Sequence, residues 1–225
     1  GNHGLSLTRY NANALMAELR AAITPVQQGA MEVRMSQLFL QYARDVQTGM
    51  LTPSRVDSAI VREVPLRSRL GTLTGFMQSN PSGFLRSLPP RSPEYTRLMR
   101  EKLRLEALLA SGGWGPAVSA GSLEPGTSGQ GVVELRNRLI AMGHMERSAT
   151  QTYDDAITAA VQRFQQANGL AVDGEVGAGT MRELNVPLER RMQSIIVAMD
   201  RERWLNRPLG HLHIWVCLPD FISVV

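Results

Sequence analysis

The sequence lacks, or nearly lacks, several features that are each typical of one class of protein. It contains one cysteine, Cys217, which excludes an internal disulfide and a metal site made of several cysteines. No stretch approaches the roughly 18 consecutive apolar residues of a membrane span, so we expect no transmembrane segment in this chain. No secretory signal is visible either, and the compartment must be inferred from the function.

Lysine is nearly absent as well, because Lys102 is the only lysine among 24 basic residues. The net charge of +4 is therefore carried by arginines, which are scattered without long runs or interleaved aromatic residues. A basic chain can suit nucleic acid, an anionic membrane or an acidic polymer. The scattered pattern favours a solvated surface that faces a weakly anionic partner, and we expect no nucleic-acid binding.

The first half of the chain is predicted to be helical. One face of an amphipathic helix is marked by apolar residues at helical spacings, namely Met31, Met35, Leu38, Phe39, Tyr42 and Val46. Gly49 is predicted to end this helix, and Thr52-Pro53 and Ser92-Pro93 are typical helix starts. The stretch between these two starts, with residues 80–83 and Pro89-Pro90, is rich in turn formers.

Residues 112–131 form the clearest boundary, because they contain seven glycines and two prolines and have little apolar periodicity. Three short helices are predicted after it. Their buried residues are expected to include Val132, Leu135, Leu139, Met142, Ile157, Val161, Phe164 and Leu184. Tyr153-Asp154-Asp155 is predicted to begin the second helix, where the helix dipole favours negative charge. A unit of about sixty residues lies at the lower edge of independent stability.

A further helix is predicted over residues 187–206, and a β-like run then extends from Leu212 to Leu218 until Pro219 interrupts it. A single strand cannot pair its backbone alone. We therefore expect residues 207–225 to be the start of a truncated β-domain. The alternative is a dimer that pairs these C-terminal strands edge to edge.

Residues 123–184 carry three motifs in a fixed order. They are a glycine-bearing loop before Val132-x-x-Leu135-x-x-x-Leu139, then Ala160-Val161-x-x-Phe164-Gln165 ending in Gly169-Leu170, and then Asp173-Gly174-x-x-Gly177-x-x-Thr180. This segment resembles the peptidoglycan-binding domain found beside many cell-wall hydrolases and transpeptidases. It departs from the family at Ala178, where proline is frequent, and by an extra glycine in the loop 126–131. The resemblance implies a three-helix domain that binds glycan strands or stem peptides.

Most residues of these motifs have a structural explanation. We expect Gly169 to end the second helix in a left-handed conformation, and Gly174 and Gly177 to permit tight turns. Thr180 is predicted to cap the third helix, and Phe164 to lie in the core. Gly126 and Gly129 belong to the loop of the first motif.

Four polar residues are candidate contacts to peptidoglycan, because they lie on or near the predicted helix ends: Asp155, Arg163, Gln165 and Asp173. Asp173 can also accept hydrogen bonds from the backbone amides of its own turn. The sequence does not choose among these four residues.

Motifs outside this segment resemble a second family. They are Tyr10-Asn11, residues 38–46 (LFLQYARDV), Leu88-Pro89-Pro90, residues 93–98 (PEYTRL), Gly112-Gly113-Trp114, residues 199–205 (MDRERWL) and residues 214–221 (IWVCLPDF). Together they are similar to the helical scaffold of large Gram-negative L,D-transpeptidases. In that family a binding module is inserted in the scaffold, and a helix returns the chain to it. The position of Cys217 is commonly asparagine there.

The second resemblance implies a cysteine acyltransferase as the parent protein, but the chain lacks the expected chemistry. Such enzymes attack a stem-peptide carbonyl with a thiolate, and a histidine assists the proton transfer. Their motif, S-x-G-C-x-R, does not occur in this sequence. Cys217 lies in an apolar run without a following arginine, and such surroundings leave a thiol inert.

Other candidate sites are equally weak. His211 and His213 would point to the same side of a strand, but no third metal ligand is adjacent. Asp200 and Glu202 are expected to lie on a salt-bridged surface with the neighbouring arginines, Arg201 and Arg203. We therefore expect no catalytic residue, no metal and no cofactor in the chain.

The sequence thus predicts a mainly α protein with a short C-terminal β-strand. Its predicted parts are a helical scaffold domain (1–118), an inserted three-helix peptidoglycan-binding domain (119–186), a helix returning to the scaffold (187–206) and the start of a truncated catalytic β-domain (207–225). The predicted function is to bind peptidoglycan and to position an L,D-transpeptidase domain for cross-linking, in the periplasm or cell envelope. The alternatives are a self-sufficient peptidoglycan-binding adaptor and a basic nucleic-acid-binding module.

Overall fold

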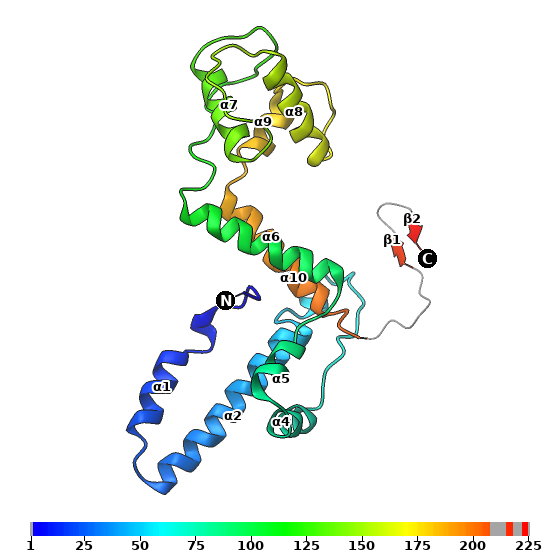
Figure 1. The fold of residues 1–225 in the computed structure, drawn as a ribbon. Coiled ribbons are helices and arrows are strands. Elements are labelled where there is room, and N and C mark those ends of the chain that lie inside the picture. The colour runs from blue at the N-terminus through cyan, green and yellow to red at the C-terminus, as the bar shows by residue number, and fades with distance from the viewer. Residues whose placement is uncertain (1, 208–214, 218–221, 225) are drawn as a thin grey trace. The chain divides into compact units, whose positions relative to one another are not determined.

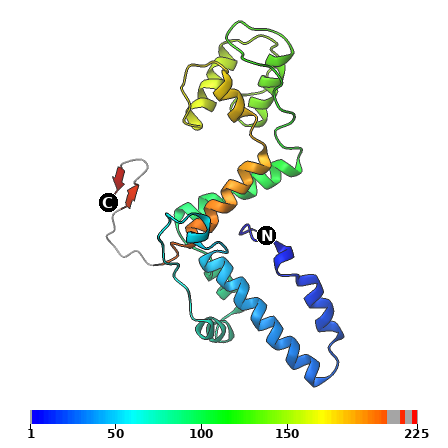
Figure 2. The same cartoon turned by 180° about the vertical axis from the view of Figure 1, so that it is seen from behind.

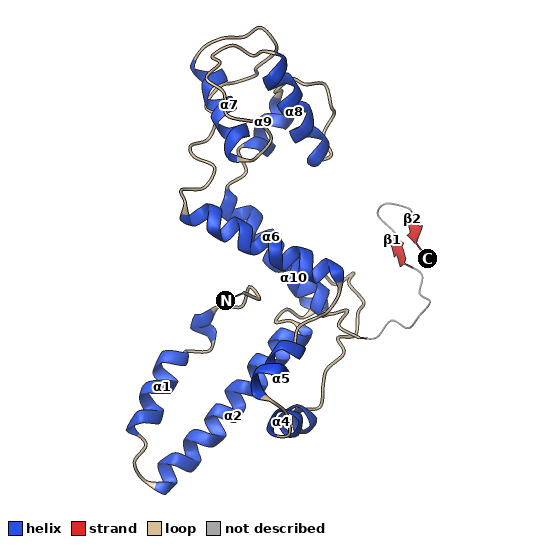
Figure 3. Cartoon of the chain, viewed as in Figure 1, coloured by secondary structure: helices blue, strands red, loops and turns tan. Residues whose placement is uncertain are grey.

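The computed structural model describes residues 2–207, 215–217 and 222–224. The fold is mainly α, as the sequence predicts (Figures 1 and 3). After a 3-10 turn at Leu7–Arg9, the described helices are α1 (Ala12–Ala21), α2 (Pro25–Thr48), α3 (Pro53–Val56), α4 (Arg69–Met77), α5 (Pro81–Ser87), α6 (Pro93–Ala110), α7 (Gln130–Ala141), α8 (Asp155–Ala167), α9 (Ala178–Leu184) and α10 (Leu188–Arg203). None of these described helices is long and apolar enough to cross a membrane.

The chain divides into two compact units. The first contains residues 1–99 and 196–225, and the second contains residues 100–195. The division passes through α6 and α10, so each of these helices contributes to both units. The predicted domain boundaries at residues 118 and 186 lie inside the second unit and stay predictions.

Helix α2, in the first unit, begins with a complete capping box. The Thr24 hydroxyl accepts a hydrogen bond from the Gln27 N–H, and the Gln27 side chain accepts one from the Thr24 N–H. Pro25 occupies the first helical position, and Gly49 ends the helix with a φ of +86°, as predicted. The buried apolar residues around α2 are Leu5, Tyr10, Ala43, Val46 and Leu88.

The stretch between α3 and α6 is more helical than its turn-forming residues indicate. Asn80 caps α5 by accepting a hydrogen bond from the Gly83 N–H at 3.0 Å, and Pro81 takes the first helical position. The Phe39 ring of α2 packs against Phe76 of α4 and Phe84 of α5, with ring centroids 4.5 Å and 6.3 Å away. The turn formers at residues 80–83 therefore begin a helix, because asparagine and proline serve a helix start as well as a turn.

A buried ion pair fixes the end of α10 within the first unit. Asp200 and Arg203 are 2% and 1% exposed, and Asp200 Oδ1 lies 3.0 Å from Arg203 Nη1. The two Asp200 oxygens also accept hydrogen bonds from the N–H groups of Met50 and Leu51, each at 2.9 Å. Arg203 donates a further hydrogen bond to the Tyr95 hydroxyl at 2.9 Å. The predicted surface salt bridge is therefore wrong for this pair, because both charges lie in the interior.

In the second unit, α7, α8 and α9 form the three-helix module that the sequence predicts. Asp154 caps α8 by accepting a hydrogen bond from the Ile157 N–H at 3.0 Å. The helices share one core, whose buried residues include Val132, Leu135, Leu139, Tyr153, Ile157, Val161, Phe164, Val176 and Leu184. Two isolated antiparallel bridges, Leu123 with Val176 and Ser128 with Thr152, join the loops. No local sequence pattern indicates these bridges.

The segments of α6 and α10 that belong to the second unit run side by side in both views (Figures 1 and 2). Leu105 of α6 and Leu188 of α10 are buried together with Trp114 in a small apolar cluster. α6 leads into the three-helix module and α10 leads out of it. The pair therefore holds the two ends of the module close to each other.

The described C-terminal residues form a two-stranded antiparallel hairpin of β1 (Trp215–Cys217) and β2 (Ile222–Val224). Cys217 pairs with Ile222 across the hairpin. A strand therefore exists within the predicted run 212–218, and its partner comes from the same chain. Pairing between the strands of two chains stays a prediction. His211, His213 and Pro219 lie outside the described residues.

Candidate functional site

Gln165, a predicted contact to peptidoglycan, lies in the interior of the module with 1% of its surface exposed. Its Nε2 donates hydrogen bonds to Asp173 Oδ1 at 2.7 Å, to the Glu175 carbonyl at 2.9 Å and to the Thr180 hydroxyl at 3.2 Å. Its Oε1 accepts a hydrogen bond from the Gly174 N–H at 2.9 Å. Both polar atoms are engaged, so Gln165 has no free group for a ligand and instead fixes the Asp173–Gly174 turn.

Asp173 belongs to the same turn but is exposed. Its Oδ1 accepts hydrogen bonds from the Glu175 N–H, at 2.9 Å, and from the Gln165 side chain. These two bonds, the backbone one first, lower the pKa of Asp173 below its ordinary value. The charged carboxylate therefore stabilises the turn, and its exposed side faces solvent, where a ligand can approach.

The glycines of the motifs have unequal roles. Gly174 has a φ of +78°, and a Cβ placed on it would lie 2.9 Å from Thr158 Cγ2, so both the backbone and the space require glycine. Gly169 follows the end of α8 with a φ of +65°, which confirms the predicted left-handed helix end. Gly177 has a φ of −74° and a ψ of −179° as the N-cap of α9. This backbone is open to other residues, so the conformational freedom of glycine is not required at Gly177.

Thr180 also differs from its predicted role. It lies inside α9, is buried and accepts a hydrogen bond from Gln165, while Gly177 is the N-cap of the helix. Phe164 is 1% exposed and belongs to the core, as predicted. In the loop before α7, Gly126 and Gly129 have φ angles of +88° and +119°.

Arg163 and Asp155 are both exposed on α8. Arg163 donates two hydrogen bonds to the His144 carbonyl, at 3.1 Å and 2.8 Å, which fixes its guanidinium beside the end of α7. Asp155 lies in the first turn of α8, near the positive end of the helix dipole. Eight residues of helix separate the two along about 12 Å, so the structure does not bring them into one site.

The second unit contains a cleft of about 490 Å³, and every residue that lines it lies between residues 101 and 195. One side is formed by residues at the C-terminal ends of the three module helices, among them His144, Asn168 and Glu183. The other side is formed by α6 and α10, which contribute Arg104, Arg190 and Arg191. Sequence reasoning assigned no function to these three arginines. No local motif marks them, because they meet only in the fold.

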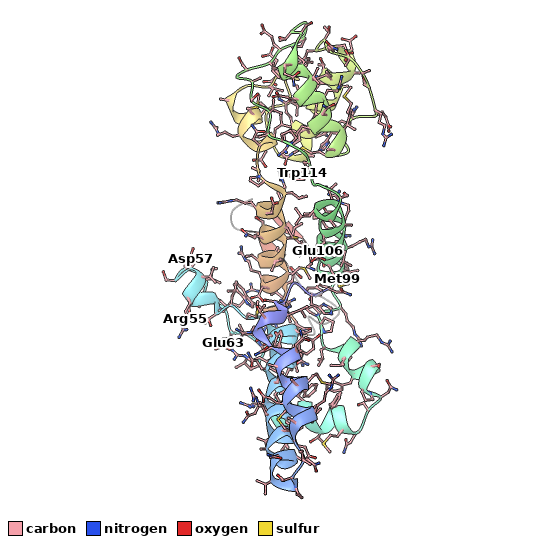
Figure 4. All side chains as sticks on the ribbon, turned by 90° about the vertical axis from the view of Figure 1, so that its left-hand side faces the viewer. Arg55, Asp57, Glu63, Met99, Glu106 and Trp114 are labelled. Carbon is pink, nitrogen blue, oxygen red and sulfur yellow. The ribbon has the colours of Figure 1, made fainter. Side chains whose placement is uncertain are left out.

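Trp114 lies at the junction of the cleft, where the α6–α10 pair meets the module (Figure 4). Its ring is 8% exposed and has two guanidinium carbons near it, that of Arg138 at 5.4 Å and that of Arg191 at 5.7 Å from the ring centroid. Arg138 is buried and donates hydrogen bonds to the carbonyls of Gly115, at 2.9 Å, and Leu184, at 3.0 Å and 2.9 Å. Arg138 thus joins the chain that enters the module to the chain that leaves it.

The charges around the cleft are partly neutralised. Arg191 forms an ion pair with Glu183 at 2.7 Å, and Arg104 forms one with Glu101 at 2.6 Å. Arg190 is exposed, and its guanidinium has no ion pair or hydrogen bond within residues 2–207. Burial, and then the positive charges of Arg163 and Arg191, lower the pKa of His144 below 6.5. His144 is therefore neutral at pH 7, and the cleft has an excess of positive charge.

Two family models match the chain. Residues 128–184 match the model described as a putative peptidoglycan binding domain, which covers all of α7, α8 and α9. Residues 1–101 match a model described as a Scaffold domain. A search of the curated proteins finds no match. The chain thus has one region similar to a peptidoglycan-binding domain and one similar to a scaffold domain, in a mainly helical protein. The first similarity supports peptidoglycan as the partner of the module.

The described part of the chain offers no group of three or more histidine, cysteine, aspartate or glutamate side chains that could hold a metal ion. Cys217 is placed in β1, where only its backbone is described. His211 and His213 fall in the segment that is not described. The expectation that the chain has no catalytic residue, metal or cofactor stays a prediction.

Proposed function

We propose that this chain binds cell-wall peptidoglycan through α7, α8 and α9, and that it positions an L,D-transpeptidase domain for the cross-linking of stem peptides. The site of action is the periplasm or the cell envelope, where that polymer lies. The observation that carries the binding half is the family match over residues 128–184, whose motif residues build one closed core. The flanking motifs and the match of residues 1–101 to a Scaffold domain support the positioning half.

The physical advantage of such a module is local concentration. A domain tethered beside its polymeric substrate meets it at an effective concentration set by the tether, so weak binding is sufficient. The closed core and the Gln165 turn hold the module surface in one shape, which lowers the entropy lost on binding. The α6–α10 pair holds both ends of the module close to each other.

Co-sedimentation with purified sacculi tests the binding half. We expect the chain to pellet with sacculi at low salt in a saturable manner, and soluble muropeptides to compete. Gly174→Val provides a variant with a damaged turn, because its side chain would overlap Thr158; its bound fraction is expected to fall. A chain that stays in the supernatant at low salt would contradict the proposal.

The positioning half needs a protein in which residues 1–225 are joined to an active L,D-transpeptidase domain. We expect Gly174→Val to slow cross-linking of intact sacculi and to leave the reaction with soluble tetrapeptides unchanged, because only the polymer requires targeting. Equal loss on both substrates would contradict a targeting role. No loss on either substrate, combined with normal sacculus binding by the unaltered chain, would favour the self-sufficient adaptor.

A further inference from the structure

The guanidinium of Arg190 is the feature of the cleft that the rest of the fold does not use. Arg104 and Arg191 are each paired with a carboxylate, whereas Arg190 lines the same cleft without an ion pair among the described residues. A guanidinium offers five N–H donors in a planar fork that matches a carboxylate. An anion that enters the cleft would therefore meet an unneutralised donor group beside two arginines already held in place.

The aromatic residues of the second unit decide between a sugar and a peptide ligand. An aromatic side chain offers a large apolar face to a ligand ring only where that face is exposed. Trp114, Tyr153 and Phe164 are 8%, 1% and 1% exposed, so none of them presents a free face. The cleft therefore offers charged and hydrogen-bonding groups beside apolar side chains such as Leu105 and Met142, without an aromatic face for stacking.

The other polar groups of the cleft suit a peptide as well. The Asn168 side chain donates a hydrogen bond to the Phe164 carbonyl at 2.7 Å, which leaves its amide oxygen to accept a peptide N–H. The neutral His144 ring lies edge-on to Phe164 at 5.4 Å and adds a group that can donate or accept. Glu183 and Glu101 also line the cleft, and each holds one of its arginines in place by an ion pair.

We propose that this cleft binds the carboxylate-bearing end of a peptidoglycan stem peptide, with Arg190 as the anchor of the carboxylate. The inference rests on the proposed function and adds to it the place of binding and the chemical class of the ligand. It also makes the site larger than the matched module, because Arg104, Arg190 and Arg191 lie outside residues 128–184. The α6–α10 pair is then part of the binding site and not only a support for the module.

The test compares two arginine substitutions with the same change of charge. Arg190→Gln removes the proposed anchor, and Arg182→Gln is the matched control, because Arg182 is exposed on α9 and does not line the cleft. Titration calorimetry with a soluble disaccharide–tetrapeptide measures the affinity of each full-length chain. We expect Arg190→Gln to weaken binding about tenfold and Arg182→Gln less than about twofold, as for loss of a charge-assisted hydrogen bond. Arg190→Lys is expected to lie between the two, because it keeps the charge without the fork.

A second probe separates the peptide from the sugar. Glycan strands stripped of their stem peptides should bind the unaltered chain at least about tenfold more weakly than the disaccharide–tetrapeptide. Equal binding of stripped strands, or equal affinities of Arg190→Gln and Arg182→Gln, would overturn this inference. The proposed function would survive both results if the chain still sedimented with sacculi. Failure of the unaltered chain to sediment would instead overturn the proposed function.

Discussion

The three-helix module and the first unit of the chain are stabilised in different ways. The module closes its apolar residues into one core, and Val172, 53% exposed, is the large hydrophobic residue that it leaves in solvent among those described. The first unit has a smaller core and leaves Val61, Ile23 and Val26 96%, 84% and 83% exposed. It also has a buried ion pair, Asp200–Arg203, whereas the buried polar residues of the module, such as Gln165, bond to neutral groups or to an exposed carboxylate.

The difference matters because the two kinds of contact respond differently to change. Apolar burial is non-directional and scales with the area removed from water, so a closed core tolerates changes at its surface. A buried ion pair depends on both partners and on the hydrogen bonds around them. We therefore expect the first unit to be sensitive to single polar substitutions, and the module to be sensitive to the loss of apolar volume.

The largest effect is expected for Asp200→Ala. The substitution leaves Arg203 buried without its carboxylate and removes the acceptor for the Met50 and Leu51 N–H groups. Breaking one side of a buried ion pair costs about 3–5 kcal/mol. Urea unfolding measures the loss in the free energy of unfolding. Hydrogen exchange then shows whether α2 and the end of α10 open more easily. Asp57→Ala, at an exposed aspartate, is the control and should change the stability by less than about 0.5 kcal/mol; equal effects would refute the internal role of Asp200.

A comparable loss, confined to the module, is expected for Leu135→Ala. Leu135 is fully buried in the core that joins α7 to α8 and α9. Truncation of a buried leucine costs about 2–5 kcal/mol, from lost transfer energy and the remaining cavity. Hydrogen exchange should show faster opening of α7–α9 amides. Leu70→Ala, at a leucine that is 75% exposed in the first unit, should leave exchange unchanged. Unchanged exchange rates of the α7–α9 amides in Leu135→Ala would contradict the role of this core in stabilising the module.

A smaller effect is expected for Gln165→Leu, which keeps the volume but removes the hydrogen bonds to the turn. The Gly174 N–H would lose its acceptor, and an unsatisfied buried donor costs about 1–3 kcal/mol. The exposed Gln166→Leu substitution on the same helix is the control. Thermal unfolding measures both variants, and similar melting temperatures would contradict the assignment of Gln165 as a structural residue.

The smallest effect is expected for the thermal stability of the module at acid pH. Backbone and side-chain hydrogen bonds lower the pKa of Asp154 and of Asp173 in the folded module. A carboxylate whose pKa is lower in the folded state than in the unfolded state stabilises the fold fully at pH values above the unfolded pKa of 3.8. This stabilisation is lost as the pH falls through the pKa of the folded state. The melting temperature should therefore drop below about pH 4. The double variant Asp154→Asn, Asp173→Asn should flatten this drop; an unchanged slope would assign it to other groups.

The sequence predicts the fold of the module better than that of the first unit. Apolar spacing at Val132, Leu135 and Leu139, and the acidic cap at Asp154, are local signals that the structure confirms. The first unit depends on contacts between residues far apart, such as Asp200 with Met50, which no spacing rule reveals. For this reason the pair Asp200 and Arg203 was expected at the surface. Residues 80–83 are turn formers by type, and they begin α5 because asparagine and proline are equally suited to a helix start.

The candidate site was harder to predict. Glycines and a buried glutamine help to define the family motif, and the hydrogen bonds of Gln165 maintain the shape of the module. The residues that line the cleft come from six segments, and Arg190 belongs to a helix outside the motif. A motif therefore indicates what kind of domain is present, while the position of its binding surface follows from the fold.

The measurement that tests the central claim most directly is an NMR titration of the full chain with a soluble disaccharide–tetrapeptide. If the module binds peptidoglycan, amide shifts should change within residues 100–195 and concentrate near His144, Asn168 and Arg190. The amides of α1 and α2 should stay unchanged, which makes the first unit an internal control. Shifts restricted to the first unit, or no shifts at a concentration that saturates sacculus binding sites, would contradict the account.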